Sequence, residues 1–166
     1  MADPLMSENA IIDGQNASYF YEESVTGKAR FSYRALAEIL KTACQNYGLL
    51  SKIALPRFLL KDENMKKCES SETIALIQRM ADEGLIIITG NHKEDDDKEM
   101  IFWAMKNDAK IISEDKGYVK HIATLPYEDR IIAEKWLKKN TIGFKFYNGE
   151  MVLQNYLPRS LKEDET

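Results

Sequence analysis

The sequence from residue 95 to residue 115 reads D-D-D-K-E-M-I-F-W-A-M-K-N-D-A-K-I-I-S-E-D, and the rest of the chain is organised around it. After the acidic start, apolar residues recur at helical spacing, which predicts an amphipathic helix that Asp96 or Asp97 caps. Residues 110–113 read as a short buried strand with carboxylates directly after it. Because ligands bind at the carboxyl ends of strands in an open parallel sheet, we expect Asp115 at the working edge.

Two other apolar runs end in a similar way. Residues 85–89 form a strand signal just ahead of the acidic cluster, and residues 10–12 run into Asp13. Carboxylates repel one another, so a fold that gathers several at one edge needs a cation there, and Mg²⁺ or Mn²⁺ suits such hard oxygen ligands. The alternative is that each Asp serves in a turn or a helix cap. For three such ends in one short chain, the metal hypothesis is favoured.

The bulk composition predicts one domain with a sizeable core, because the chain has 166 residues and is 44% hydrophobic. The first residues lack the pattern of a secretory signal, and the longest apolar run, residues 85–88, is too short to span a membrane. Two cysteines indicate reduced thiols rather than a disulfide framework. We therefore expect a cytoplasmic or nuclear protein with no membrane contact.

The net charge of −4 comes from the two ends, because residues 1–9 and 162–166 carry −2 each and leave the body neutral. Residues 10–161 carry a net charge of +6 once six acids expected at the edge of the sheet are left out, namely Asp13, Glu94, Asp95, Asp96, Asp97 and Asp115. A basic surface around an acidic metal pocket is compatible with a phosphate polymer as substrate. An ordinary solvated surface would give the same balance.

Helix and turn signals fill the remaining chain. One helix is expected after an N-cap at Ser32 and up to Gly48, a second after an N-cap at Ser70 or Ser71 and up to Gly84, and a third after Pro126. Residues 53–55 read as a strand.

The segments between these elements read as loops or turns. Residues 17–30 and 61–69 are interpreted as loops, and residues 116–124 as an irregular segment. The aromatic run Tyr19–Tyr21 in the first loop either stacks on bases or packs against its own scaffold. Asn148-Gly149 is a strong two-residue hairpin signal.

Strands that alternate with helices predict a three-layer α/β/α sandwich with a mainly parallel, Rossmann-like central sheet, followed by a C-terminal hairpin. We expect a domain over residues 9–157, a flexible N-terminus over 1–8 and an acidic, disordered tail over 158–166. The sequence contains no glycine-rich dinucleotide motif, phosphate loop, D-x-D pair after strand one, or G-x-S-x-G elbow. Among the chemistries that α/β domains of this kind carry out, metal-assisted hydrolysis of a phosphodiester is the one that remains.

Several short motifs resemble the NYN branch of the PIN-like ribonucleases, and the Regnase (MCPIP, Zc3h12a-like) family especially. They are I-I-D-G-Q-N at residues 11–16, D-D at 96–97 and S-E-D at 113–115. The resemblance extends through F-S at 31–32 to the hairpin at 148–149, so it covers about residues 9–157. Each motif is short, but their order and spacing together make the match specific.

The resemblance implies that Asp13, Asp96, Asp97 and Asp115 form a Mg²⁺-binding centre, with Mn²⁺ as the other candidate ion. It also implies that Asn16 positions the scissile phosphate or holds Asp13, and that the activity is endonucleolytic cleavage of single-stranded or loop RNA. In this mechanism Asp97 holds the ion and Asp115 orients or deprotonates the attacking water.

The expected contacts to the RNA backbone are basic residues around this centre: Lys28, Arg30, Arg34, Lys93 and Lys116. The chain departs from the family at Val119, where another acid is usual, and at residues 91–95, where a basic run is usual. These departures favour an alternative function, a catalytically weak or silent NYN domain that binds RNA and acts as a scaffold through a partner.

Partners other than RNA are expected on two grounds. No CCCH zinc finger sequence is present, which leaves RNA choice to the domain or to an RNA-targeting protein partner. The resemblance also implies a homodimer, and Phe102 with Trp103 makes the helix after the acidic cluster apolar over more than one face.

Overall fold

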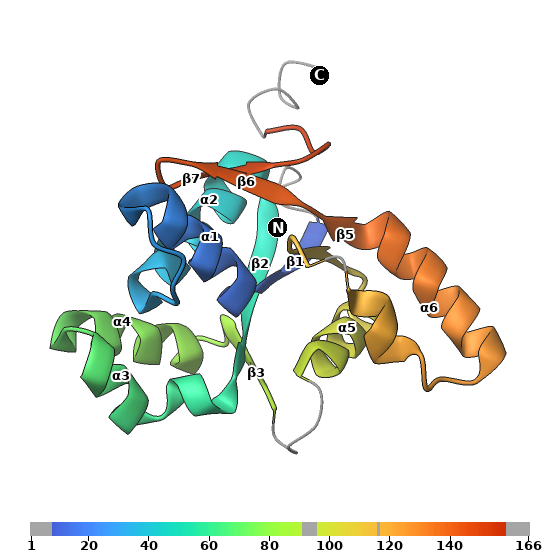
Figure 1. The fold of residues 1–166 in the computed structure, drawn as a ribbon, viewed down its shortest axis with the longest axis horizontal. Coiled ribbons are helices and arrows are strands. Elements are labelled where there is room, and N and C mark those ends of the chain that lie inside the picture. The colour runs from blue at the N-terminus through green and yellow to red at the C-terminus, as the bar shows by residue number, and fades with distance from the viewer. Residues whose placement is uncertain (1–7, 91–95, 116, 159–166) are drawn as a thin grey trace.

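The computed structural model describes residues 8–90, 96–115 and 117–158, and its centre is a parallel sheet. The strands are β1 (Glu8–Asp13), β2 (Leu49–Pro56), β3 (Ile86–Thr89), β4 (Ala109–Ile112) and β5 (Thr141–Ile142), in the spatial order β3-β2-β1-β4-β5 (Figure 1). Asp13 pairs with Ala54 of β2, and Ile12 pairs with Ile112 of β4. Because all the pairings are parallel, the carboxyl ends of the strands lie along one edge of the sheet.

Helices cover both faces of the sheet (Figure 1). One layer holds α1 (Gly14–Thr26), α2 (Tyr33–Tyr47), α3 (Asp62–Cys68) and α4 (Ser71–Asp82), and the other holds α5 (Asp96–Lys106) and α6 (Tyr127–Asn140). Two 3-10 segments, η2 (Arg57–Leu60) and η3 (Tyr118–Ile122), follow β2 and the end of β4. The predicted three-layer architecture is therefore confirmed.

The sheet separates two hydrophobic cores. Successive residues of β1 point to opposite faces, so Ile12 packs with α1, α2 and α4, whereas Ile11 packs with α5 and α6. Because β1 is covered on both faces, its residues 10–12 form a continuous apolar run rather than an alternating one. The burial of β1 on both sides also fixes Asp13, its last residue.

The predicted C-terminal hairpin consists of β6 (Phe144–Tyr147) and β7 (Glu150–Leu153), with left-handed backbone at Asn148 and Gly149 (φ 51° and 84°). The hairpin packs on α1. Phe20 lies edge-on to Phe144 at a ring distance of 5.6 Å, and Tyr21 lies edge-on to Phe146 at 5.7 Å. Of the two interpretations of the aromatic run, packing against the scaffold therefore holds for Phe20 and Tyr21.

The prediction of a loop over residues 17–30 is wrong, because α1 occupies most of that range. Its buried residues recur at helical spacing, but they are small or polar: Gly14, Ala17, Ser18 and Glu22. A hydrophobic pattern cannot reveal such a helix. Gly14 has to be small, because a Cβ atom there would lie 2.7 Å from the carbonyl oxygen of Ala54.

The prediction of a loop over residues 61–69 is also wrong, since most of this range forms the short helix α3, which buries Met65. Within the expected irregular segment, η3 buries Tyr118 and Ile122. The cap at Ser70 is confirmed by the bond from the N–H of Thr73 to its hydroxyl (3.3 Å).

The predicted cap at Ser32 differs, because Ser32 occupies the N-cap of α2 without capping it through its side chain. Asp96 and Asp97 lie in the first turn of α5.

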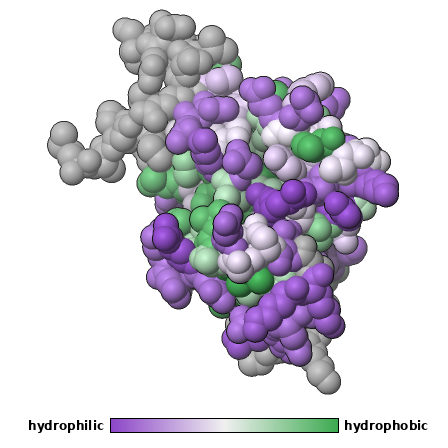
Figure 2. Space-filling view, turned by 90° about the vertical axis from the view of Figure 1, so that its left-hand side faces the viewer, coloured by the Kyte–Doolittle hydropathy of each residue, from purple (hydrophilic) through white to green (hydrophobic). Residues whose placement is uncertain are grey.

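The surface toward α1–α4 is mainly hydrophilic, with hydrophobic side chains gathered near its middle (Figure 2). On the other layer, Phe102 is 38% exposed, while Trp103 packs against the second core. Within the described ranges, no helix has the length and apolar character needed to cross a membrane. The predicted flexible N-terminus and acidic tail fall, apart from Glu8 and Pro158, outside the described residues.

Candidate active site

All four predicted metal-binding aspartates belong to the carboxyl-terminal edge of the sheet. Asp13 is the last residue of β1, Asp115 follows the end of β4, and Asp96 and Asp97 open the helix that follows β3. The parallel topology, rather than proximity in sequence, brings these segments to the same edge.

Asp13 is held by three neighbours. Its Oδ2 accepts a hydrogen bond from the Tyr118 hydroxyl at 2.7 Å and a long one from the Ser113 hydroxyl at 3.5 Å. Its Oδ1 accepts from the backbone N–H of Asn16 at 3.3 Å, which caps α1. Burial raises the pKa of the Asp13 carboxyl, these hydrogen bonds lower it, and the charge of Asp115 raises it further.

The side chain of Asn16 joins the start of α1 to the end of β4. Its Oδ1 accepts from the backbone N–H of Glu114 at 2.8 Å and from the hydroxyl of Ser113 at 3.2 Å. The same hydroxyl accepts from the backbone N–H of Asp115 at 3.0 Å. Asn16 and Ser113 therefore keep the two acidic segments in register with each other.

Glu114 and Asp115 are adjacent in sequence, but their side chains accept hydrogen bonds from different segments. Asp115 Oδ1 accepts from the N–H of Gly117 at 2.8 Å and lies near Asp13. Glu114 Oε1 instead accepts from the N–H of Phe144 at 2.6 Å, in the space left by the missing side chain of Gly143. Glu114 thus ties the hairpin to the sheet.

The two acids of α5 face different partners. Asp97 Oδ2 lies 3.2 Å from Nε2 of His121, whose side chain is only 13% exposed. Asp96 lies against Gly90, where a Cβ atom would overlap its carboxylate, and Gly90 has a φ of 76°. The glycine after β3 is therefore needed for Asp96 to sit at this edge.

The donor set has the chemistry of a site for a hard cation, because it is made of carboxylates whose charges act on one another. The pKa of the Tyr118 hydroxyl is raised by burial, then by the charges of Asp13 and Asp97. Among the described residues, no three His, Cys, Asp or Glu side chains converge closely enough to hold a metal ion. Contacts to Tyr118 and His121 engage Asp13 and Asp97 instead.

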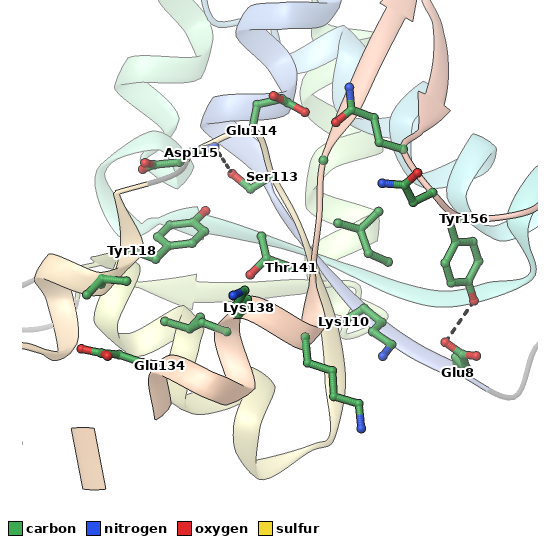
Figure 3. A pocket seen from close by; sticks show the side chains of 17 residues that line it. Glu8, Lys110, Ser113, Glu114, Asp115, Tyr118, Glu134, Lys138, Thr141 and Tyr156 are labelled. Carbon is green, nitrogen blue, oxygen red and sulfur yellow. Dashed lines mark hydrogen bonds between the residues drawn. The ribbon is translucent and has the colours of Figure 1, made fainter. Parts of the chain in front are cut away.

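A groove of about 980 Å³ adjoins this edge (Figure 3). Asp115 and Tyr118 line one end, and Glu8 and Tyr156 line the other, where the Tyr156 hydroxyl donates to Glu8 at 3.0 Å. Its walls come from β4, η3, α6 and β5 and include three lysines, namely Lys110, Lys138 and Lys139. Val119, where the family has an acid, also lines the groove and is 48% exposed.

The predicted RNA-binding residues are only partly brought together. Arg30 and Arg34 converge on Glu22, and Lys28 is exposed on the same turn of chain. Lys93 and Lys116, like the segment 91–95, lie outside the described residues.

Several side chains that contact the candidate site or the arginines were not predicted from the sequence, among them Ser113, Tyr118, His121 and Glu22. Ser113 stood inside the S-E-D motif, which was a usable signal. Tyr118 and His121 lie in a segment without a clear pattern, and Glu22 lay in a helix interpreted as a loop.

Comparisons with known proteins give a family and a shared fold. The family model described as the Zc3h12a-like ribonuclease NYN domain matches residues 6–160. The search of curated protein sequences gives no match.

Two solved structures of nuclear protein-only RNase P 2 (PRORP2) from Arabidopsis thaliana share the fold. One has a TM-score of 0.67 and 20% identity, the other 0.61 and 18%, each over 92% of this chain. This chain spans 30% of the length of either protein.

Proposed function

The chain belongs to the Zc3h12a-like ribonuclease NYN domain family, and from this premise we propose a metal-dependent endoribonuclease that cuts single-stranded or loop RNA. The observation that carries the proposal is Asp13, a half-buried carboxylate at the end of the central strand that lies near a second acid, Asp115. The hydrogen bonds that Asp13 accepts come from neutral donors, and a divalent cation beside it would supply a countercharge.

Mg²⁺ or Mn²⁺ would be held at this edge of the sheet by Asp13, Asp96, Asp97 and Asp115. The chemistry that such an ion supplies is polarisation of the phosphate and a lower pKa for the attacking water. Asp115, whose Oδ1 is already oriented by Gly117, would orient or deprotonate that water. Asn16 would keep Asp13 and the segment 113–115 in register, since its backbone N–H donates to Asp13 and its amide oxygen accepts from Ser113 and Glu114.

The RNA backbone would be bound by Lys28, Arg30, Arg34, Lys93 and Lys116 around the acidic edge. Arginine and lysine neutralise phosphates without reading bases, so this set predicts binding with little sequence preference. Sequence choice would then come from a protein partner. A homodimer through the helix face around Phe102 and a cytoplasmic or nuclear location complete the proposal.

A cleavage assay tests the hydrolytic function. A labelled single-stranded RNA should be cut internally with Mg²⁺ or Mn²⁺ and spared with EDTA. Asp97→Asn should abolish cleavage while the circular dichroism spectrum and melting curve stay folded. Asp108→Asn is the matched control, because Asp108 is exposed at the other end of β4 and its left-handed backbone (φ 48°) suits Asn. Cleavage that survives Asp97→Asn would overturn the site assignment.

A second candidate function, an RNA-binding scaffold without catalysis, is favoured by one observation. Tyr118 already donates to Asp13, and Val119 stands where a further acid is usual, so the acidic edge is partly engaged without a metal. The same assay separates the two functions. A scaffold binds the RNA in a gel shift but leaves it intact at every metal concentration.

A further inference from the structure

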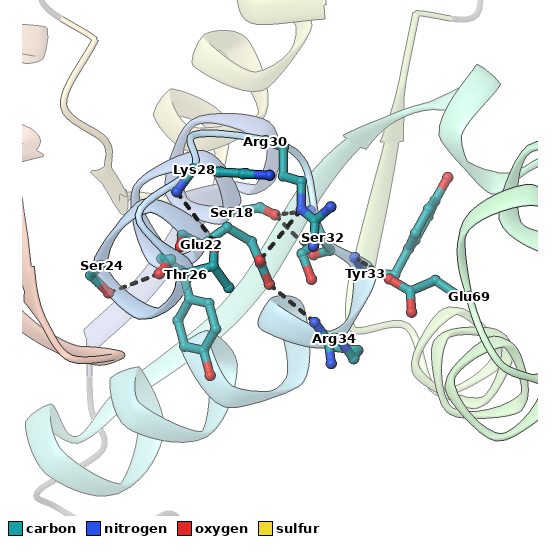
Figure 4. A network of polar contacts seen from close by, with 11 residues as sticks. Ser18, Glu22, Ser24, Thr26, Lys28, Arg30, Ser32, Tyr33, Arg34 and Glu69 are labelled. Atoms are coloured by element: carbon teal, nitrogen blue, oxygen red, sulfur yellow. Dashed lines mark hydrogen bonds and ion pairs between the residues drawn. The ribbon is translucent and has the colours of Figure 1, made fainter.

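Glu22 is a buried carboxylate outside the acidic edge. Its side chain is 2% exposed, on the inner face of α1, and two arginines approach it from the surface (Figure 4). Arg30 Nε lies 3.7 Å from Oε2, and a terminal nitrogen of Arg34 lies 3.6 Å from Oε1. Within the described part of the chain, Oε2 has no hydrogen-bond partner.

Stability does not account for this arrangement. Removing a carboxylate from water carries a large penalty, which only well-placed, hydrogen-bonded partners recover. Here both partners are 62% exposed, and both separations exceed hydrogen-bonding distance, so each ion pair is weak. An apolar side chain at position 22 would pack against α2 without that penalty. We therefore look for the role of Glu22 in what the two arginines bind.

The arginines keep most of their binding capacity. Each guanidinium carries five N–H donors in a planar fork, and Glu22 attracts each one through a single nitrogen from the protein side. The exposed remainder of both forks faces solvent. Two guanidinium groups held over one buried charge have less freedom to lose when they bind a phosphate group in two places.

The position of the pair suits RNA that enters the acidic edge. Glu22 and Asn16 share α1 and are six residues apart, which is about 9 Å along a helix axis. A strand bound at Arg30 and Arg34 would therefore reach Asn16 and Asp13 within a few nucleotides.

We infer that Glu22 is a positioning residue for RNA binding, which orients Arg30 and Arg34 as a paired site for the phosphodiester backbone. The inference rests on the proposed function for its ligand and adds a residue to its machinery. The competing explanation is that Glu22 only neutralises the two arginines. The two explanations predict opposite signs when the charge of Glu22 is removed.

The experiment measures the affinity for a fluorescent, mixed-sequence single-stranded RNA by polarisation, at several salt concentrations. The protein carries Asp97→Asn and the buffer contains EDTA, so that the RNA stays intact. Glu22→Gln keeps the length of the side chain and removes its charge. Glu23→Gln is the matched control, because it removes the same charge from the adjacent, exposed residue.

If Glu22 positions the arginines, Glu22→Gln weakens RNA binding about threefold to tenfold although it removes a negative charge, because the guanidinium groups lose their preorganisation. Glu23→Gln leaves the affinity unchanged or raises it slightly. Arg30→Gln with Arg34→Gln lowers the slope of log affinity against log salt by about 1.4, or 0.7 for each phosphate contact. In that double variant, Glu22→Gln has no further effect, because it acts through the arginines.

An increase in affinity with Glu22→Gln, equal to that of Glu23→Gln, overturns the inference and leaves a neutralising role. Should Glu22→Gln fail to fold, the surface variants Arg30→Gln and Arg34→Gln decide alone, and an unchanged salt slope overturns the paired site. RNA binding that depends on Glu22 without any cleavage contradicts the hydrolase but supports the inference. If instead the RNA is cut, and Glu22→Gln changes neither the KM nor the affinity, the result supports the hydrolase and contradicts the inference.

Discussion

Two carboxylates that are shielded from water, one at the N-terminus of α1 and one within it, are supported in opposite ways. Asp13, the N-cap of α1, is surrounded by a phenol, a hydroxyl and a backbone N–H, with another carboxylate nearby. Glu22, two turns further on, faces two arginines and has an oxygen without a hydrogen bond. Asp13 is thus hydrogen-bonded by neutral donors, whereas Glu22 is approached by two cationic side chains.

This difference indicates what each site still lacks. A carboxylate with neutral donors and an acidic neighbour has unused attraction for a cation. A carboxylate with two cations nearby has a surplus of positive charge beside it, and that surplus is available to an anion. The same helix would therefore offer one end to a metal and its middle to a phosphate.

The largest expected effect is the loss of RNA cleavage when the charge of Asp13 is removed. Asp13→Asn keeps the size of the side chain but removes the charge, and should lower RNA cleavage by about 10²–10⁴-fold, the usual effect of losing a catalytic group. Initial rates at saturating RNA measure it, with Glu23→Gln as the control that keeps wild-type rates. A folded Asp13→Asn protein with full activity would contradict the proposed centre.

Gly14→Ala should disturb both regions together, because Gly14 directly follows Asp13 and begins α1, the helix that carries Glu22. The new methyl group would lie 2.7 Å from Ala54 O and from Leu55 Cδ2, so the helix must shift from the sheet. Such overpacking destabilises by about 1–3 kcal/mol. Urea denaturation measures the loss, and Gln15→Ala at the next position, which adds no bulk, should change stability far less.

Magnesium should act on the acidic edge and not on the arginine pair. At ten times its dissociation constant, Mg²⁺ stabilises the native protein by about 1.4 kcal/mol if the unfolded chain has no site. Asp115→Asn keeps the acceptor for the N–H of Gly117 but removes the charge near Asp13. It should stabilise the metal-free protein and abolish the Mg²⁺ effect.

Thermal melts with and without Mg²⁺ check this prediction, and Glu22→Gln should retain the full Mg²⁺ shift. Asp115 is a better position for this test than Asp97, whose carboxylate also lies beside His121. A destabilised Asp115→Asn protein, together with no Mg²⁺ effect on the wild type, would mean that the acids serve only as caps and turn residues.

The smallest expected effect concerns Tyr21, next to Glu22. Burial raises the pKa of the Tyr21 hydroxyl above 10.0, the charges of Glu38 and Glu22 raise it further, and Arg34 lowers it. Since the folded pKa exceeds the unfolded one, Tyr21 contributes stability below about pH 10 that is lost as the pH rises through the folded value. Glu22→Gln should lower this pKa slightly, and ultraviolet titration against Tyr21→Phe measures it.

The sequence by itself determined the parallel α/β fold and the acids at its strand ends. Residues 10–12 and 111–112 are fully buried, and such short apolar runs are typical of central strands covered on both faces. The Asp residues that follow them then reach one edge because the strands are parallel. The turn at Asn148-Gly149 was equally predictable, because two left-handed residues are needed there.

Only the tertiary structure decided what holds those acids and where α1 lies. The Tyr118 hydroxyl meets Asp13 across 105 positions of sequence, and no local pattern signals such a contact. α1 stayed hidden because its inner face is made of Gly14, Ala17, Ser18 and Glu22, which fit against a sheet and hairpin that are already crowded. Where small or charged residues are buried, their surroundings and not their hydrophobicity determine the structure, and these surroundings exist only in the folded chain.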